Sequence, residues 1–248
     1  MSENESQDFL AEKYSPVFYR IFSWYVLFLF RRRFQCVWVD KSNYLSTGTS
    51  TLFIGNHNLW WDGLIPLLLN ETIFHHRGRA MMDEVQLRKH PFFRYLGTFS
   101  INRQHPRKAR QSLEHAAGLI NNAKVNDPVG LWLYPEGKLV SPETPITLES
   151  GLIWLARRID NKKAEIVPFV THIHCMRSDK PELFIKFGNP VASATYLSGN
   201  MLALTTRMLE DLRYQCRIRS GQLDPHTGAP EGNFKLLLGK VPDYQVQR

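Results

Sequence analysis

The residues TLFIGNHNLWWD, numbered 51–62, give the first indication of the architecture of this chain. An apolar run that stops at Gly55 is typical of a strand buried in a sheet, and the Leu-rich residues 64–69 favour a helix behind it. In sheets of parallel strands, ligands bind beyond the carboxyl ends of the strands, where the chain turns into the next helix. The polar residues between these two elements are therefore the first candidates for chemistry.

The rest of the chain continues the alternation of strands and helices. Strands are predicted at 80–82, 98–101, 130–134, 165–172 and 183–187, and helices at 84–95, 106–123, 148–158 and 197–219. This alternation predicts an α/β fold, a single domain with a mostly parallel central sheet flanked by helices. We assign residues 37–220 to this domain, residues 1–36 to an N-terminal membrane-associating segment and residues 221–248 to a Gly/Pro-rich C-terminal tail.

The composition is that of a globular protein with an excess of positive charge. Of the 248 residues, 43% are hydrophobic, and 31 Lys and Arg against 23 Asp and Glu give a net charge of +8. This charge favours an anionic partner, such as nucleic acid, anionic lipid or a phosphorylated ligand. The basic residues of segment 103–110 lack interleaved aromatics and a recognition motif, so nucleic acid is not expected. Three scattered cysteines fit a reducing compartment and exclude zinc-finger and thioredoxin-like sites.

Residues 17–30 form an aromatic-rich stretch that is interrupted by Arg20 and followed by the triplet 31–33 of arginines. A membrane-spanning helix needs about 20 apolar residues, more than this stretch supplies. The acidic residues within 1–13 disfavour a secretory signal. We expect a helix in the membrane interface, on the cytoplasmic face, in a peripheral or monotopic protein whose arginines meet an anionic membrane surface. A helix packed on the soluble core is the alternative.

His57 and Asp62 are the sharpest chemical signal in the sequence. Their spacing of five residues would place them about 140° apart on a regular helix, so they can meet only across a strand-to-helix turn. A carboxylate bonded to one ring nitrogen fixes the tautomer of an imidazole and leaves the other nitrogen as a general base. The alternative is that His57 caps the helix and Asp62 is a solvated acid in its first turn.

Three further groups lie near predicted strand ends. Glu136, Gly137 and Lys138 follow the strand at 130–134, and a carboxylate beside a glycine suits hydroxyl or phosphate binding. Arg103 closes the segment GTFSINR, and its guanidinium offers two donors to a phosphate. The third group is Val167-Pro168, where a proline inside an apolar run marks a strand end or an irregular segment.

In this order and at these spacings, the four blocks resemble those of the glycerolipid acyltransferases, which include the lysophosphatidic acid acyltransferases. That family carries an N-H-x4-D motif, a G-x-x-F-I-x-R-like motif, an E-G-T-R motif and a V-P-hydrophobic motif. The corresponding residues here are 56–62, 97–103, 136–137 and 167–168, and the similarity covers about residues 52–191.

The resemblance implies an O-acyltransferase that needs no cofactor and no metal. In such an enzyme His57 is the general base and Asp62 orients it. The acyl donor is acyl-CoA or acyl carrier protein, used as a co-substrate, and the acceptor is a membrane lipid such as a lysophospholipid. Arg103, Glu136 and Gly137 are implied to bind the acceptor, and we add the neighbouring Lys138 and Asn56 as candidates; these five residues form the candidate substrate-binding set.

One departure from the family pattern concerns the acceptor. The third block reads Glu136-Gly137-Lys138-Leu139, so that Leu139 replaces the usual Arg. Either one phosphate contact is lost or Lys138 supplies it as a point charge. A lysophospholipid without a terminal phosphate, or a sugar hydroxyl of a glycolipid or glycosylated terpenoid, is then an alternative acceptor.

Three other readings remain at this point. The chain could be a membrane-surface lipid-binding protein of the same fold without turnover, or a thioesterase in which the same base activates water. A metal site at His172 and His174 would require a third ligand, which the sequence does not identify, so strand-end histidines are the simpler interpretation.

Overall fold

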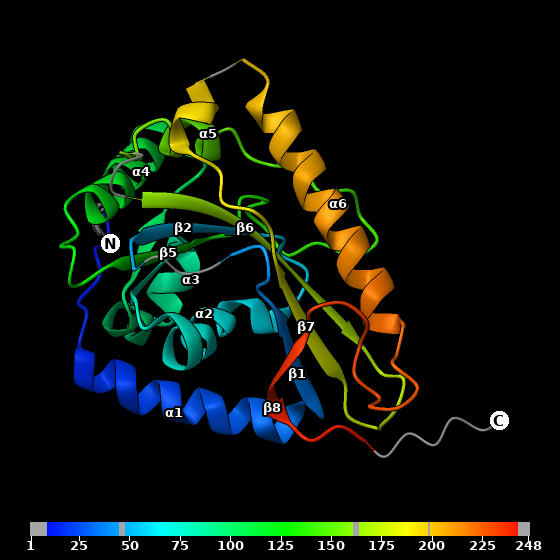
Figure 1. Ribbon diagram of the computed structural model, residues 1–248. Coiled ribbons are helices and arrows are strands. Elements are labelled where there is room, and N and C mark those ends of the chain that lie inside the picture. The colour runs from blue at the N-terminus through cyan, green and yellow to red at the C-terminus, as the bar shows by residue number, and fades with distance from the viewer. Residues whose placement is uncertain (1–8, 45–47, 161–163, 198, 243–248) are drawn as a thin grey trace.

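The computed structural model contains one eight-stranded sheet with the order β4-β3-β5-β2-β6-β7-β1-β8 (Figure 1). It describes residues 9–44, 48–160, 164–197 and 199–242. The strands are β1 (Cys36–Asp40), β2 (Ser50–Gly55), β3 (Arg77–Asp83), β4 (Thr98–Ile101), β5 (Val129–Leu133), β6 (Ala164–His174), β7 (Glu182–Phe187) and β8 (Lys235–Gly239). All neighbours are parallel except β6 with β7 and β1 with β8. The predicted single α/β domain with a mostly parallel sheet is thus confirmed.

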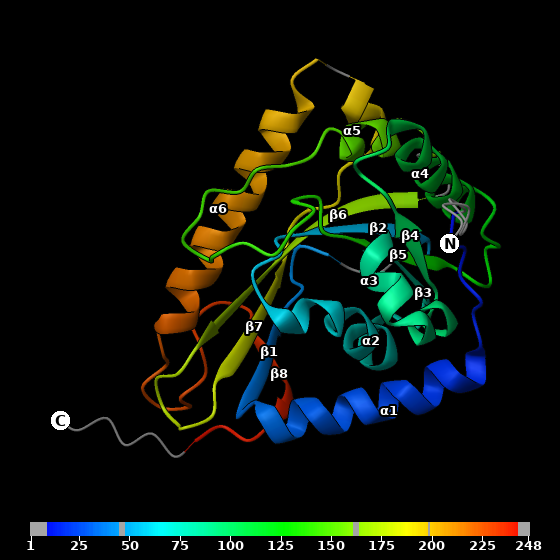
Figure 2. The ribbon, with the colours of Figure 1, turned by 180° about the vertical axis from the view of Figure 1, so that it is seen from behind.

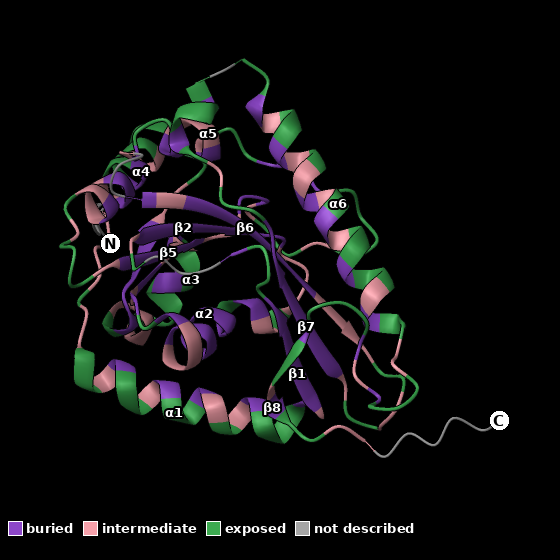
Figure 3. Cartoon of the chain, in the orientation of Figure 1, coloured by how far each residue is buried: buried purple, intermediate pink, exposed green. Residues whose placement is uncertain are grey.

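Helices cover both faces of the sheet (Figures 1 and 2). The helices are α1 (Pro16–Arg33), α2 (Ile65–Leu69), α3 (Glu84–Lys89), α4 (Pro106–Asn121), α5 (Gly151–Ala156) and α6 (Met201–Gly221), with short helical segments η1 (Trp60–Gly63), η2 (Asn70–Phe74), η3 (Pro91–Leu96) and η4 (Ser193–Leu197). One apolar cluster lies between the sheet and α4, α5 and α6, and a second lies between the sheet and α1 and α2. The central strands are therefore buried on both sides (Figure 3).

The strand at the centre of the site is β2, which lies between β5 and β6. All six of its residues are buried, as expected for the apolar run that ends at Gly55. Because β2, β3, β4, β5 and β6 run in the same direction, the residues that follow them gather at one edge of the sheet. This edge brings together three of the four sequence blocks.

Three predicted helices differ from the observed ones. The helix expected at 84–95 divides into α3 and η3 at Pro91, because a proline lacks an amide donor and disfavours a helical residue before it. The helix expected at 148–158 is shortened to α5, since the amide of Glu149 bonds to the carbonyl of Pro135 and holds that residue in the preceding loop. The helix expected at 197–219 begins only at Met201, after Asn200, so that α6 is a separate element from η4.

Two strands were not anticipated from the sequence. Cys36–Asp40 forms β1, whose first residue falls inside the range 1–36 assigned to the membrane-associating segment. Lys235–Gly239 forms β8 within the range 221–248 assigned to the tail, and it pairs with β1 in antiparallel fashion. Both strands are short. The Gly/Pro-rich residues around β8 are typical of loops, so the sequence pattern does not predict a strand there. Residues 1–8 and 243–248 of these ranges lie outside the described residues.

The aromatic-rich stretch forms α1, which has two apolar sides. Residues 19, 23, 26 and 30 point inward and are buried against the sheet and α2. Residues 17, 21, 24 and 28 are more than half exposed, together with Tyr25. At about 100° per residue the two stripes lie on opposite sides of the helix, because they are offset by two positions. The helix is thus packed on the core and also presents an apolar outer stripe to its surroundings. Within the described part of the chain, α1 included, no helix combines the length and hydropathy that a membrane crossing requires.

Candidate active site

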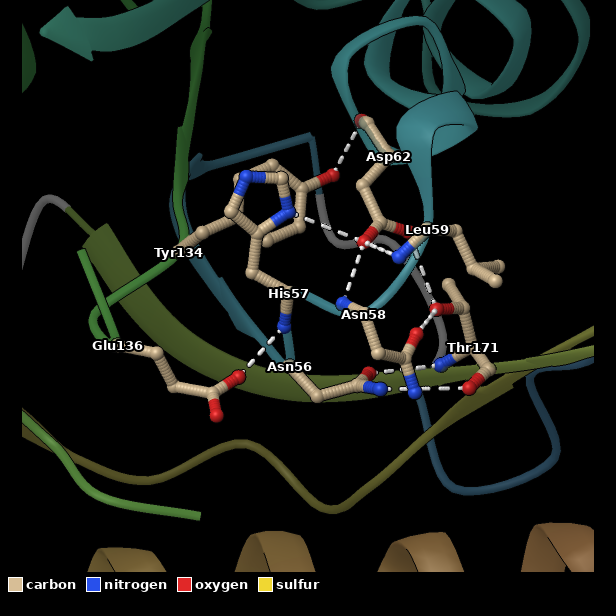
Figure 4. Close-up of polar contacts among 8 residues, drawn as sticks. All are labelled: Asn56, His57, Asn58, Leu59, Asp62, Tyr134, Glu136 and Thr171. Carbon is tan, nitrogen blue, oxygen red and sulfur yellow. Dashed lines mark hydrogen bonds and ion pairs between the residues drawn. The ribbon is translucent and has the colours of Figure 1, made fainter. Parts of the chain in front are cut away.

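His57 and Asp62 meet across the turn that links β2 to η1 (Figure 4). The Nδ1 atom of His57 lies 3.1 Å from Oδ2 of Asp62. The carboxyl side chain is completely buried, whereas 27% of the His57 side chain is exposed. The two residues therefore form the contact that their spacing allows only in a strand-to-helix turn, and the alternative of a solvated Asp62 is excluded.

The Asp62 carboxylate is held by four donors. Its Oδ2 atom accepts the amides of Asn58 at 3.0 Å and Leu59 at 2.9 Å in addition to the contact with His57. Its Oδ1 atom accepts the hydroxyl of Thr171, on β6, at 3.1 Å. Burial raises the pKa of Asp62, and the hydrogen bonds from His57, Leu59 and Thr171 oppose that rise. The carboxylate is thereby fixed in position before any ligand binds.

The imidazole of His57 is oriented from two sides. The Asp62 carboxylate accepts a hydrogen bond from Nδ1–H, so the Nε2 atom carries the lone pair in the neutral ring. The ring stacks on Tyr134 with centroids 4.8 Å apart. The Tyr134 hydroxyl in turn donates to the main-chain carbonyl of Asp62 at 2.5 Å. Among the described residues Nε2 has no hydrogen-bond partner, and it is free to accept a proton from a ligand.

The backbone of His57 is clamped by the loop that follows β5. Its amide donates to Oε2 of Glu136 at 2.6 Å, and its carbonyl accepts the amide of Val140 at 2.9 Å. Glu136 is 5% exposed, and burial raises the pKa of its carboxyl group, while the hydrogen bond from His57 opposes this rise. Glu136, which we predicted to bind substrate, thus also fixes the position of the histidine.

Gly137 and Arg103 lie against each other. Gly137 has φ of +69°, and an added Cβ atom would come closer to the Arg103 guanidinium than van der Waals contact permits. Arg103 comes from the segment after β4, is 38% exposed and lies 3.6 Å from Glu149. The structure therefore brings Arg103, Glu136 and Gly137 together beside His57, as the sequence blocks predict.

The remaining predicted residues have different surroundings. Lys138 and Leu139 are exposed, and Lys138 forms no ion pair with a described residue. Asn56 is buried, and its amide group exchanges two hydrogen bonds with the main chain of Thr171, at 2.8 Å and 3.3 Å. This contact ties the end of β2 to β6 (Figure 4). Asn56 accordingly positions the turn from within the sheet.

Two residues of the site were not identified from the sequence. Thr171 lies four positions after Val167 in β6, and Tyr134 ends the apolar segment GLWLY. Neither residue belongs to a recognisable motif, and each reaches Asp62 only because β5 and β6 flank β2. Pro168 lies inside β6 rather than at its end, where the pairing with β7 has not yet begun.

His172 and His174 lie elsewhere on β6 and contact each other edge to face, with ring centroids 5.9 Å apart. Burial lowers the pKa of His172 to about 4, and His174 contacts the carbonyl of Ser220 at 3.0 Å. Within residues 9–44, 48–160, 164–197 and 199–242, no three His, Cys, Asp or Glu side chains gather as metal ligands would. The pair therefore has no identifiable third ligand.

Comparison with known protein families identifies the fold and its class. A family model described as acyltransferase matches residues 36–172, which is more than half of the chain. The chain belongs to the acyltransferase family. The matched part of this acyltransferase runs from the first residue of β1 into β6. It includes His57, Asp62, Arg103 and Glu136. The resemblance to glycerolipid acyltransferases is confirmed at the level of the family.

A solved structure extends the likeness of this acyltransferase to most of its length. The 1-acyl-sn-glycerophosphate (LPA) acyltransferase PlsC from Thermotoga maritima is similar with a TM-score of 0.55 and 16% identity, over 82% of this chain and 81% of that chain. At this identity the comparison concerns the fold alone. A search among curated proteins gives no match.

Proposed function

We propose that this acyltransferase moves a fatty acyl group from acyl-CoA or acyl carrier protein to a hydroxyl group of a lysophospholipid of the 1-acylglycerol-3-phosphate type. The observation that carries the proposal is the pair of His57 and the buried Asp62, which leaves Nε2 of His57 free at the carboxyl edge of the sheet. A base held by a buried carboxylate suits the deprotonation of an alcohol near neutral pH.

The chemistry requires no group beyond the two substrates. His57 Nε2 takes the proton of the acceptor hydroxyl, and the oxygen attacks the thioester carbonyl. The tetrahedral intermediate collapses with cleavage of the carbon–sulfur bond, and the proton on His57 passes to the departing thiolate. Asp62 stabilises the imidazolium in between. The products are an ester and a free thiol, and no acyl-enzyme forms.

Acceptor binding is assigned to Arg103 with the Gly137 backbone. The guanidinium is a bidentate donor for a phosphate, and it lies beside the Glu136 that clamps His57. Lys138 is a second positive charge in the same loop, exposed and unpaired among the described residues. These groups support a phosphate-bearing acceptor near the catalytic histidine.

A second acceptor class is favoured by a groove beyond Arg103. This groove of about 320 Å³ is lined by Asp83, Glu84, Val85, Asn102, Arg103 and Gln104. Strands in a sheet are about 4.8 Å apart, so the ends of β3 and β4 lie roughly 10 to 14 Å from the end of β2. A sugar headgroup spans such a distance better than glycerol phosphate does. Leu139, at the place of the usual Arg, supports the same glycolipid alternative.

We also propose that α1 lies on the cytoplasmic surface of a membrane. Its outer stripe exposes Trp24, Phe28 and Tyr25, and the exposed residues 20 and 31–33 are arginines. Aromatic side chains favour the headgroup region, and arginines favour anionic phosphates. Such an arrangement would place the acyltransferase at the source of its lipid acceptor.

The test is an assay of the purified protein with acyl-CoA or acyl carrier protein and a panel of lysophosphatidate, other lysolipids and glycolipids. We expect a new ester that is absent with His57→Ala. The identity of the ester separates the phosphate acceptor from the glycolipid. Release of free fatty acid alone would indicate hydrolysis, and the absence of turnover with every pair would favour a lipid-binding protein of the same fold.

A further inference from the structure

We propose that the turn between His57 and Asp62 is itself part of the membrane-docking surface, with Trp60 as an anchor that enters the bilayer beside α1. This inference rests on the proposed function, because it assigns a surface to the same site. It adds a second membrane contact that is separate in sequence from the aromatic helix.

Most of the Trp60 side chain faces outward and is available for contact with a membrane. Its side chain is 71% exposed, although it lies in the turn that holds the buried Asp62. The contact between His57 and Asp62 does not involve its ring. Large exposed aromatics are uncommon within a well-packed site, and tryptophan prefers the boundary between water and lipid.

Trp61 fixes the distance between this turn and α1. Its ring packs edge to face on Phe30 at 5.1 Å and on Phe34 at 5.2 Å, at the end of α1. The ring of Trp60 in turn lies 5.3 Å from that of Trp61. Trp60 is therefore within about one helix width, roughly 10 Å, of the inner side of α1.

The turn and α1 lie on the same side of the sheet. Figure 4 shows Asp62 on one side of β6 and α6, in orange, on the other. Figure 1 shows α1 and α2 on the face of the sheet opposite α6. A bilayer that meets the outer stripe of α1 would thus lie on the side of the sheet that carries this turn.

The positive charge around Trp60 and the outer stripe of α1 favours an anionic bilayer as the partner of this surface. Arg31, Arg32 and Arg33 are exposed at the end of α1 that contacts Trp61, and Arg20 is exposed nearer its start. An apolar outer stripe flanked by arginines complements hydrocarbon bordered by phosphates. With Trp60 inserted beside this helix end, a lipid acceptor reaches His57 without leaving the membrane surface.

The experiment measures binding to vesicles and acyl transfer in parallel. Trp60→Ala is compared with the matched variant Tyr214→Ala, which removes a 68% exposed aromatic ring from α6 on the opposite face. Sedimentation with phosphatidylglycerol-containing vesicles gives the affinity. Tryptophan quenching by brominated lipids gives insertion, and transfer to a water-soluble short-chain acceptor gives the chemistry without a membrane.

We expect Trp60→Ala to weaken vesicle binding about tenfold, as loss of part of an inserted indole surface implies. It should reduce bromolipid quenching and transfer to vesicle-borne acceptor, but leave transfer to the short-chain acceptor unchanged. Tyr214→Ala should change none of these. The inference would be overturned if Trp60→Ala bound vesicles with the wild-type affinity. It would also be overturned if the variant lost as much transfer to the short-chain acceptor as to the vesicle-borne acceptor. Either result would leave the acyltransferase proposal intact. Failure of all transfer by the wild-type protein would instead reject the proposed function, and vesicle binding would still report on Trp60.

Discussion

The hydroxyl of Thr171 donates to Oδ1 of Asp62 over 3.1 Å, although 109 residues separate the two in the chain. The same threonine exchanges main-chain hydrogen bonds with Asn56, one position before His57. Strand β6 therefore supports both ends of the turn that contains the His57–Asp62 pair. The geometry of this pair depends on the packing of β6 beside β2, and not only on the residues of the turn.

Thr171→Val should lower kcat about fivefold and leave KM for the acceptor nearly unchanged. The substitution keeps the shape and the main-chain bonds to Asn56 but removes the hydroxyl, which lies 3.1 Å from Asp62 Oδ1 and 3.3 Å from Asn58 Oδ1. The hydrogen bond to Asp62 is worth about 1 kcal/mol. Because that bond lowers the pKa of Asp62, its loss should raise this pKa and shift the acid limb of the pH–rate profile to higher pH. Steady-state kinetics across pH tests this, and Thr171→Ser is the control that keeps the hydroxyl. Equal losses in both variants would mean that packing, and not the hydrogen bond, matters.

Asp62→Asn should reduce acyl transfer by about two to four orders of magnitude, the range associated with general base catalysis. The amide oxygen can still accept from Asn58 and Leu59, so the turn should keep its shape. What is lost is the negative charge that stabilises the imidazolium of His57 in the proposed mechanism. Single-turnover rates with saturating acyl donor measure the effect, and circular dichroism confirms the fold. A rate close to that of the wild-type protein would rule out a catalytic role for the pair.

Gly137→Ala should cost about 1 to 2 kcal/mol of stability, because φ of +69° is unfavourable for a residue with a Cβ atom. The new methyl group should also displace the Arg103 guanidinium and raise KM for a phosphate-bearing acceptor. Gly63→Ala is the matched control, since no atom of the described residues lies within 4 Å of the added Cβ and its φ is not positive. Chemical denaturation and acceptor titration test both effects. An unchanged KM would separate Arg103 from acceptor binding.

Leu139→Arg restores the residue type that the glycerolipid acyltransferases carry in their third motif. Leu139 is 54% exposed, so the longer side chain should be accommodated without a loss of stability. We expect the ratio of kcat/KM for lysophosphatidate to that for a glycolipid acceptor to rise at least tenfold, because an arginine binds phosphate in bidentate fashion. Leu139→Gln is the uncharged control. A ratio that does not respond would show that position 139 does not contact the headgroup.

Acidification should destabilise the protein through His76. This ring is 5% exposed and lies at a tilt beside the rings of Phe53 and Phe74, and among the residues that the structure describes neither of its nitrogens has a hydrogen-bond partner. Burial lowers the pKa of His76 to about 4, whereas the unfolded chain titrates near 6.5. The unfolded state therefore binds more protons between these values, and stability falls as pH decreases through this window.

From pH 8 to pH 5 the loss due to His76 should be about 2 kcal/mol, and above pH 7 its contribution should be constant. His76→Phe removes the titrating group, so the difference in unfolding free energy between pH 8 and pH 5 should shrink by about that amount. Denaturant titrations at the two pH values provide the measurement. An identical difference in the variant would contradict a neutral, buried His76.

The sequence allows prediction of those parts that local patterns encode. The run TLFIG followed by NHNLWWD is enough to predict a buried strand and a turn, and it limits a contact of His57 with Asp62 to that turn. In the same way, the predicted strand at 130–134 places Glu136 just beyond a strand end. Arg103 was a candidate from its place after a predicted strand, the family resemblance gave it a role in acceptor binding, and the structure places it against Gly137.

The residues that pattern analysis missed act across the sheet. Thr171 and Tyr134 contact Asp62 only because β5 and β6 lie on either side of β2. The order of the strands in the sheet cannot be predicted from local periodicity in the sequence. Strand β1 is missed for a related reason: its five residues follow the arginine triplet, and their partners are β7 and β8. The two apolar sides of α1 also required the fold, since composition alone does not assign a buried side.

The pairing of β1 has a consequence for the order of folding during synthesis. Residues 36–40 emerge directly behind α1, but both strands that flank them, 182–187 and 235–239, come from the last third of the chain. At about 5 to 20 residues per second, the first partner appears roughly 7 to 30 s later. During this interval α1 can already pack against Trp61, Asn70 and Phe92, which precede β7 in the chain. The helix α1 would thus find its partners in η1, η2 and η3 before β1 gains either of its neighbours in the sheet.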